Sequence, residues 1–330
     1  MLSFWITDKS GVSKQIDNVL TVVWDCDMGV PADSLTITCP YSGDIRGNAV
    51  AMKVYEDEKL AFSGGVDTIV AVKQAKQVVL KLSCRSLAAG LLDNEAEPVT
   101  YNTPGASLIY EKHIKPFGIR LAEADNIPFY DKLRIGKGFS HWQVVQWFCR
   151  NRYNTEPRIT GDGVAYLKGY HPEGESVFSD KGTGVSYYSL KETHRRYRLI
   201  SEVKMKFRQA NTYRSSVKNS NPEAAFVKSV RYVNAAAEEK NIDTVERMIA
   251  NGNRNSYALN ISCIGCHTGL VGTHAVIDDS VLGRISGLLV KSVRYSADRR
   301  GGVSTITLEK ERFDVADELH NEKFNFSAVG

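Results

Sequence analysis

Cysteine is scarce in this chain of 330 residues, and its six copies are scattered. Small secreted domains that depend on disulfides carry a much denser cysteine framework. We therefore expect a reduced setting inside the cell, with a hydrophobic core rather than crosslinks stabilising the fold. The cysteines are Cys26, Cys39, Cys84, Cys149, Cys263 and Cys266.

Long apolar runs and a strong excess of one charge are also missing. No stretch approaches the roughly 18 uncharged apolar residues of a membrane-spanning helix. The N-terminal stretch lacks a charged segment followed by an apolar run, which is the pattern of a secretory signal. The formal net charge is only +4, which does not indicate a nucleic-acid binder. We expect no membrane contact and no specific nucleic-acid binding.

The short motifs of common enzyme classes are absent as well. The sequence has no G-x-S-x-G elbow, no phosphate-binding P-loop and no H-E-x-x-H pair. Its seven histidines do not fall at metal-ligand spacing on one helix. Asp278 and Asp279 are adjacent carboxylates, a pattern more typical of a turn than of an acid–base pair. We expect no catalytic residues and no enzymatic activity.

One motif that does suggest chemistry is C-x-x-C-H at Cys263, Cys266 and His267, the attachment pattern of a c-type haem. The preceding residues alternate as in a strand that enters a Gly-rich turn, and side chains three apart in a strand point to opposite faces. Haem attachment needs an export route, and structural zinc needs a second ligand pair. We interpret both cysteines as core and turn residues and expect no cofactor. A zinc site that also uses His274 is the alternative.

What the chain has in abundance is short segments of alternating hydrophobicity. Residues 1–95 hold about six of them, such as VLTVVW and SLTITC, separated by turns of Gly, Pro, Asp and Asn. Regular spacing of such segments favours an antiparallel barrel or sandwich. Residues 171–315 return to this pattern, interrupted by one helix that we expect to end at Gly252.

Residues 96–170 have a different, helical character. A first helix is predicted from Thr103 and Pro104 to Gly118, and a second begins at Ser140. The sequence therefore predicts a mainly β fold with an α+β insert. Its parts are a first β-barrel region at 1–95, a small α+β domain at 96–170, a second β-barrel region with one helix at 171–315, and a polar C-terminal tail at 316–330.

Basic residues gather mildly at two places, and we take these as interface candidates. Arg195 and Arg196 follow a predicted strand, and Arg299 and Arg300 occupy a predicted hairpin loop.

The order of these elements resembles that of central hub proteins in the baseplates of contractile phage tails. A strand leads into Ser83-Cys84-Arg85-Ser86, followed by Leu87, Leu92 and Asp93. Then come Pro116-Phe117-Gly118-Ile119, a helix with Trp142 and Phe148, a turn at Asp162-Gly163, and a closing hairpin within residues 285–313. The resemblance covers roughly residues 70–312, and the order of the motifs carries it.

The resemblance to T-even, Mu-type and tail-like bacteriocin hubs implies a structural protein with two tube-like antiparallel β-barrels. It implies a homotrimer that joins the tail tube protein to the central spike protein, with the tape measure protein ending in its lumen. Such a hub is assembled in the bacterial cytoplasm and becomes part of the particle. The alternatives are a wall- or carbohydrate-binding tail module, with Trp142 or Trp147 as a sugar platform, and a tail-associated peptidoglycan hydrolase.

Overall fold

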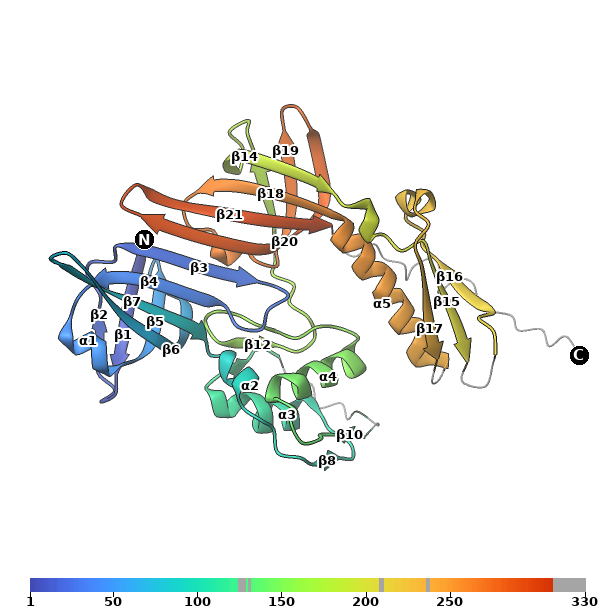
Figure 1. Cartoon of the computed structure of the whole chain (residues 1–330), viewed down its shortest axis with the longest axis horizontal. Coiled ribbons are helices and arrows are strands. Elements are labelled where there is room, and N and C mark those ends of the chain that lie inside the picture. The colour runs from blue at the N-terminus through green and yellow to red at the C-terminus, as the bar shows by residue number, and fades with distance from the viewer. Residues whose placement is uncertain (124–128, 130–131, 208–210, 236–237, 311–330) are drawn as a thin grey trace, which may run out of the picture. The chain divides into compact units, whose positions relative to one another are not determined.

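The computed structural model describes residues 1–123, 129, 132–207, 211–235 and 238–310 (Figure 1). The chain forms two compact units. Unit 1 comprises residues 1–176, 262–273 and 290–306, and unit 2 comprises residues 177–261, 274–289 and 307–330. The division into four segments that the sequence suggested stays a prediction. Its last segment, the polar tail at 316–330, lies outside the described residues. No helix among the described residues is long and apolar enough to cross a membrane.

The predicted mainly β fold with small α+β parts is confirmed. In unit 1, strands are hydrogen-bonded in the order β20-β3-β4-β7-β6-β5-β1-β2. Alternate residues of these strands are buried, so that Val22, Trp24 and Cys26 on β3 face the core while their neighbours are half-buried or exposed. The elements of this region are β1 (Leu2–Asp8), β2 (Ser13–Gln15), β3 (Thr21–Asp27), β4 (Ser34–Pro40), α1 (Gly43–Asn48), β5 (Ala49–Glu56), β6 (Lys59–Gln74) and β7 (Gln77–Ser86).

The helical stretch that follows, residues 96–170 and here called the insert, has its own core around α4 (His141–Tyr153). Ser140 caps α4 in a reciprocal capping box with Gln143, which agrees with the predicted start. The first predicted helix forms one continuous helical stretch over residues 106–117, which changes from α to π to 3-10 geometry and ends at the predicted Gly118 with a φ of 73°. Its start differs from the prediction, because the N-cap position is Gly105, without a side-chain cap, rather than Thr103. The short elements before and within the insert are α2 (Ala89–Asp93), β8 (Thr100–Tyr101), α3 (Ala106–Ile109), η1 (Tyr110–Ile114), η2 (Lys115–Phe117), β9 (Arg120–Leu121), β10 (Leu133–Arg134), β11 (Arg158–Ile159) and β12 (Val164–Tyr166).

The later strands include a closed ring of six. The order is β19-β13-β14-β18-β21-β20, and β19 also pairs with β20, which closes the ring. These strands are β13 (Glu175–Ser179), β14 (Val185–His194), β18 (Tyr257–Ile264), β19 (His274–Asp279), β20 (Gly283–Asp298) and β21 (Gly301–Lys310). The 3-10 turns η3 (Arg196–Arg198) and η5 (Thr268–Leu270) follow β14 and β18.

Unit 2 also contains a small helix-on-sheet layer (Figure 1). Strands β15 (Glu202–Phe207), β16 (Ser215–Lys218) and β17 (Val230–Ala235) form a three-stranded sheet, and α5 (Glu238–Ser256) lies against one of its faces. A turn, η4 (Pro222–Phe226), links β16 to β17. Val203, Met205, Val245 and Ile249 form the buried core between helix and sheet.

The predicted helix end at Gly252 is wrong, because α5 continues to Ser256. Gly252 lies within the helix, where a Cβ atom would stand 3.1 Å from the carbonyl oxygen of Arg198. The glycine therefore permits a close approach to η3 rather than a stop.

Candidate functional site

The motif that underlies the sequence resemblance forms a charged latch in unit 1. Arg85 on β7 donates to Asp67 (Nε to Oδ2, 2.6 Å) and to Asp93 (Nη2 to Oδ2, 2.7 Å). The hydrogen bond from Arg85 to Asp93 holds the pKa of Asp93 below its usual value. Because all three side chains are about a third to a half exposed, we assign them a positioning role, with little net stability. The latch joins β6, β7 and α2.

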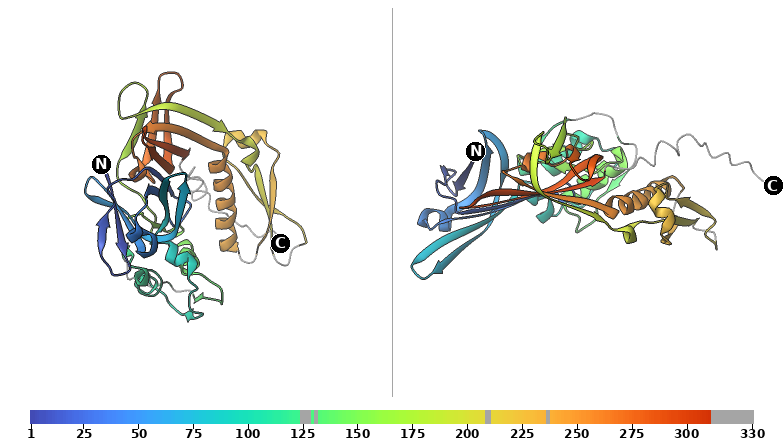
Figure 2. Two further views of the ribbon diagram at one scale, coloured as in Figure 1. Left: turned by 60° about the vertical axis from the view of Figure 1, so that its left-hand side comes forward. Right: turned by 90° about the horizontal axis from the view of Figure 1, so that it is seen from above.

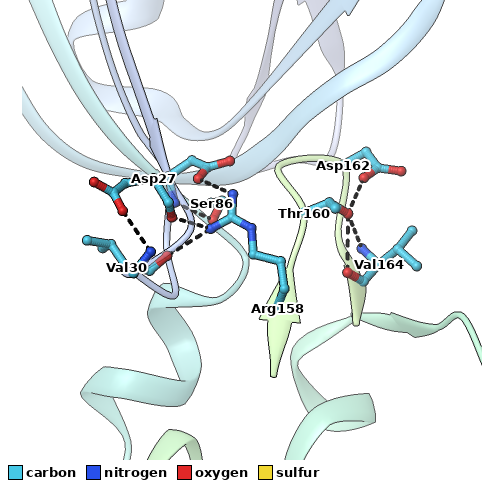
Figure 3. Close-up of polar contacts among 9 residues, drawn as sticks. Asp27, Val30, Ser86, Arg158, Thr160, Asp162 and Val164 are labelled. Atoms are coloured by element: carbon cyan, nitrogen blue, oxygen red, sulfur yellow. Dashed lines mark hydrogen bonds and ion pairs between the residues drawn. The ribbon is translucent and has the colours of Figure 1, made fainter. Parts of the chain in front are cut away.

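A second, deeply buried cluster of polar contacts, here called the clamp, includes Ser86, which follows Arg85 in the sequence (Figure 3). The Arg158 guanidinium donates through Nη2 to Asp33 Oδ1 at 2.9 Å and through Nη1 to the carbonyl oxygens of Asp27 and Val30. Ser86 fixes the backbone of Asp33. The Ser86 amide donates to the Asp33 carbonyl oxygen, and the Ser86 Oγ accepts from the Asp33 amide. Burial raises the pKa of Asp33, and Arg158 opposes this. The insert is thereby tied to the turn between β3 and β4.

A polar cavity of about 340 Å³ surrounds this clamp. Its lining includes Trp24, Glu56, Arg158, Asp162 and Tyr170. Trp24 Nε1 and Arg158 Nε are buried without a hydrogen-bond partner among the described residues. A cavity of this size and polarity accommodates ordered water, which would satisfy both donors.

One cysteine thiol lines this cavity. Cys26 lines the cavity, and burial, followed by the Asp33 charge, raises its pKa well above the usual range. A protonated thiol is a poor nucleophile. Burial therefore leaves Cys26 without activation as a nucleophile.

The residues of the C-x-x-C-H motif occupy core and turn positions. Cys263 is fully buried on β18, and Gly265 takes a φ of 98° in the turn that follows. His267 places Nε2 3.0 Å from the Ile264 carbonyl oxygen, and Cys266 Sγ lies 3.5 Å from Thr268 Oγ1. In the described part of the chain no three His, Cys, Asp or Glu side chains gather as metal ligands.

Asp279, one of the two adjacent carboxylates, stabilises a turn through hydrogen bonds. Its Oδ1 accepts from the amides of Val281 and Leu282, and its other oxygen accepts from the Tyr187 hydroxyl. These bonds lower the pKa of Asp279 and cap the tip between β19 and β20.

The four interface candidates lie at surface turns. Arg195, half-buried, and exposed Arg196 lead into η3, and Arg196 Nε approaches Glu223 Oε2 at 3.8 Å. Arg299 and Arg300 form the exposed turn between β20 and β21, where Arg300 pairs with Asp298 at 2.8 Å. Arg195 and Arg196 belong to unit 2, whereas Arg299 and Arg300 belong to unit 1. The role of these four residues at an interface stays a prediction.

The β6–β7 hairpin offers an open sheet edge that the sequence prediction did not single out. β6 pairs with β5 only as far as Gly65, whereas its pairing with β7 on the other side continues to Gln74 (Figure 2). The outer edge of residues 67–74 therefore has no strand partner among the described strands. Residues 68–72 read TIVAV, an uncharged β-branched stretch that soluble proteins usually cover or interrupt with charge.

Two solved structures match nearly the whole chain in both directions. The tail protein from Neisseria meningitidis MC58 is 17% identical with a TM-score of 0.73, over 94% of this chain and 96% of that one. The 43 kDa tail protein of prophage MuSo2 from Shewanella oneidensis is 15% identical with a TM-score of 0.73, over 94% and 98%. This chain has a phage tail protein fold.

More distant structures share the tail-protein fold. An E. coli component of the type VI secretion system, described as structurally similar to the T4 tail proteins gp27 and gp5, is 9% identical with a TM-score of 0.53 over 90% of this chain and 74% of that one. No family model matches the sequence. No curated protein matches it either. The resemblance predicted from the order of motifs is thus confirmed at the level of fold.

Proposed function

We propose that this chain is the central baseplate hub subunit of a contractile phage tail or a phage-tail-like particle. The observation that carries the proposal is the match to two phage tail proteins over at least 94% of both chains at a TM-score of 0.73. The proposed role is structural.

The proposed assembly is a homotrimer that joins the tail tube to the central spike. Each chain supplies a ring of six strands and a second curved sheet built from β1 to β7, so three copies would offer six β regions to a six-subunit tube. The unpaired edge at residues 67–74 supports an assembled state, because exposed backbone N–H and C=O groups favour pairing with another chain. The tape measure protein is the third proposed partner, and assembly takes place in the bacterial cytoplasm.

The carbohydrate-binding alternative receives no support from the insert. Trp142 is 9% exposed and packs in the insert core, and Trp147 packs against the same core. A sugar platform needs an open ring face.

Native mass spectrometry of the full chain, alone and mixed with its tube and spike proteins, tests the proposal. We expect a trimer, formed alone or on addition of the spike. A chain that stays monomeric with both partners present contradicts the hub assignment. Clearing of a peptidoglycan gel by the purified chain would replace the structural role with a hydrolytic one.

A further inference from the structure

Positive charge is concentrated in one short part of unit 2. Residues 195–235 contain ten Lys and Arg but only two Glu, a balance of +8, whereas the whole chain balances at +4. The remainder of the chain therefore carries −4. A modest total charge conceals a local field that attracts polyanions.

The sheet of β15, β16 and β17 presents three of these ten basic residues on one face. Val203 and Met205 are buried against α5, and successive side chains of a strand alternate between faces, so Lys204 and Lys206 project from the opposite face. Lys204 pairs in register with Tyr232 on β17, and Lys218 on β16 pairs with Glu202. We call this surface the lysine face. It comprises Glu202, Lys204, Lys206, Lys218, Tyr213, Tyr232 and Asn234.

An exposed aromatic ring is held in place among these lysines. Tyr232 is 61% exposed, and its ring centroid lies 4.9 Å from that of Tyr213 in an edge-on arrangement. Tyr213 is itself fixed by Lys206 Nζ, 5.3 Å from its ring centroid, and by its hydroxyl, which donates to Asn234 Oδ1 at 2.8 Å. Glu202 is the one carboxylate on the lysine face, 3.7 Å from Lys204 Nζ. Tyr232 is therefore preorganised yet open to a ligand.

We propose that the lysine face binds single-stranded nucleic acid without reading its sequence. Lysines at alternate strand positions contact successive phosphates, and a base stacks on Tyr232. An acidic peptide would satisfy the lysines but would leave the exposed ring without a planar partner. A duplex hides its base faces within the stack, so Tyr232 gains nothing from it.

Fluorescence anisotropy of a labelled 20-nucleotide oligo(dT) with the full chain, measured over a series of KCl concentrations, tests this proposal. We expect a Kd of order 10⁻⁴ to 10⁻⁶ M that weakens with salt. Changing Lys204, Lys206 and Lys218 together to Gln should weaken binding at least tenfold and reduce the log–log salt slope by about 2, because each lost phosphate contact on a single strand contributes about 0.7. Tyr232→Ala should weaken binding by roughly fivefold or more with little change in slope.

The matched control changes Lys53, Lys59 and Lys76, three exposed lysines of unit 1, to Gln. It removes the same charge from the chain and should leave binding within twofold of wild type. Equal weakening by the control overturns the assignment to the lysine face. A 20-residue poly-glutamate or a duplex that binds as tightly as oligo(dT) overturns the assignment to single strands. Neither result bears on the trimer, so this inference fails or stands independently of the proposed function.

Discussion

His113 is a buried side chain whose protonation has an energetic cost. It is 2% exposed, with Nδ1 3.0 Å from His141 Nδ1 and Nε2 3.3 Å from the Tyr101 hydroxyl. Burial, and then the neighbouring His141, lowers the pKa of His113 to about 4. The fold therefore prefers this imidazole neutral.

We predict that the chain loses stability on acidification below neutral pH. Because the folded pKa of His113 lies below its unfolded value near 6.5, the stability it contributes is complete above that value and declines as pH falls toward 4, by up to about 3 kcal/mol. Urea unfolding at pH 7 and pH 4.5 measures this. His113→Gln should reduce the difference in the free energy of unfolding between the two pH values. The control His274→Gln, at an exposed position, should leave that difference unchanged. An unchanged pH dependence in His113→Gln contradicts the assignment.

The Arg158–Asp33 pair should show strong energetic coupling. Arg158→Met leaves a buried carboxylate without its cation, and Asp33→Asn leaves a buried cation without its anion, so each should cost about 3–5 kcal/mol. The double variant should cost clearly less than the sum, as measured by urea unfolding in a double-mutant cycle. Additive effects would show that the two groups do not compensate each other.

At the scale of elements, strand alternation and the α4 cap were predictable because both depend on neighbours within a few residues. The Arg158–Asp33 clamp was not, because its members are 125 residues apart and a lone Arg in a two-residue strand gives no local signal. Gly252 was misread because a helix stop and a close helix contact both require glycine. The lysine face was overlooked because the net charge of the whole chain, +4, hides the local excess of +8 in residues 195–235.

The β6–β7 ladder provides a matched pair of glycines. A Cβ on Gly64 would stand 2.0 Å from the Arg85 carbonyl oxygen, whereas a Cβ on Gly65 meets nothing within 4 Å. We predict that Gly64→Ala destabilises the fold by several kcal/mol because backbone must move, while Gly65→Ala stays within about 1 kcal/mol of wild type. Thermal and urea unfolding of both variants distinguish them. Similar losses in the two variants would falsify the close-approach explanation.

At the scale of the whole molecule, the exposed turn at Arg299 and Arg300 is one of the candidates for contact with another protein. Changing both to Glu reverses charge at the tip of a hairpin without touching the core, so the folded chain should persist while assembly or docking weakens at least tenfold. Native mass spectrometry with tube and spike proteins measures this. Normal assembly of the variant excludes the turn from the interface.

The chain passes between its two units five times, and β20 contributes residues 283–289 to unit 2 and residues 290–298 to unit 1. Melting one unit therefore removes part of a strand that the other needs. Calorimetry should record a single endotherm in which the van't Hoff and calorimetric enthalpies agree, whereas independent units would give two. The same interlacing means that residues 1–176, expressed alone, would lack the β20 partner of β3 and expose the edge beside Trp24. On this reading neither unit is an independent module, and a truncation within either one should weaken the whole chain.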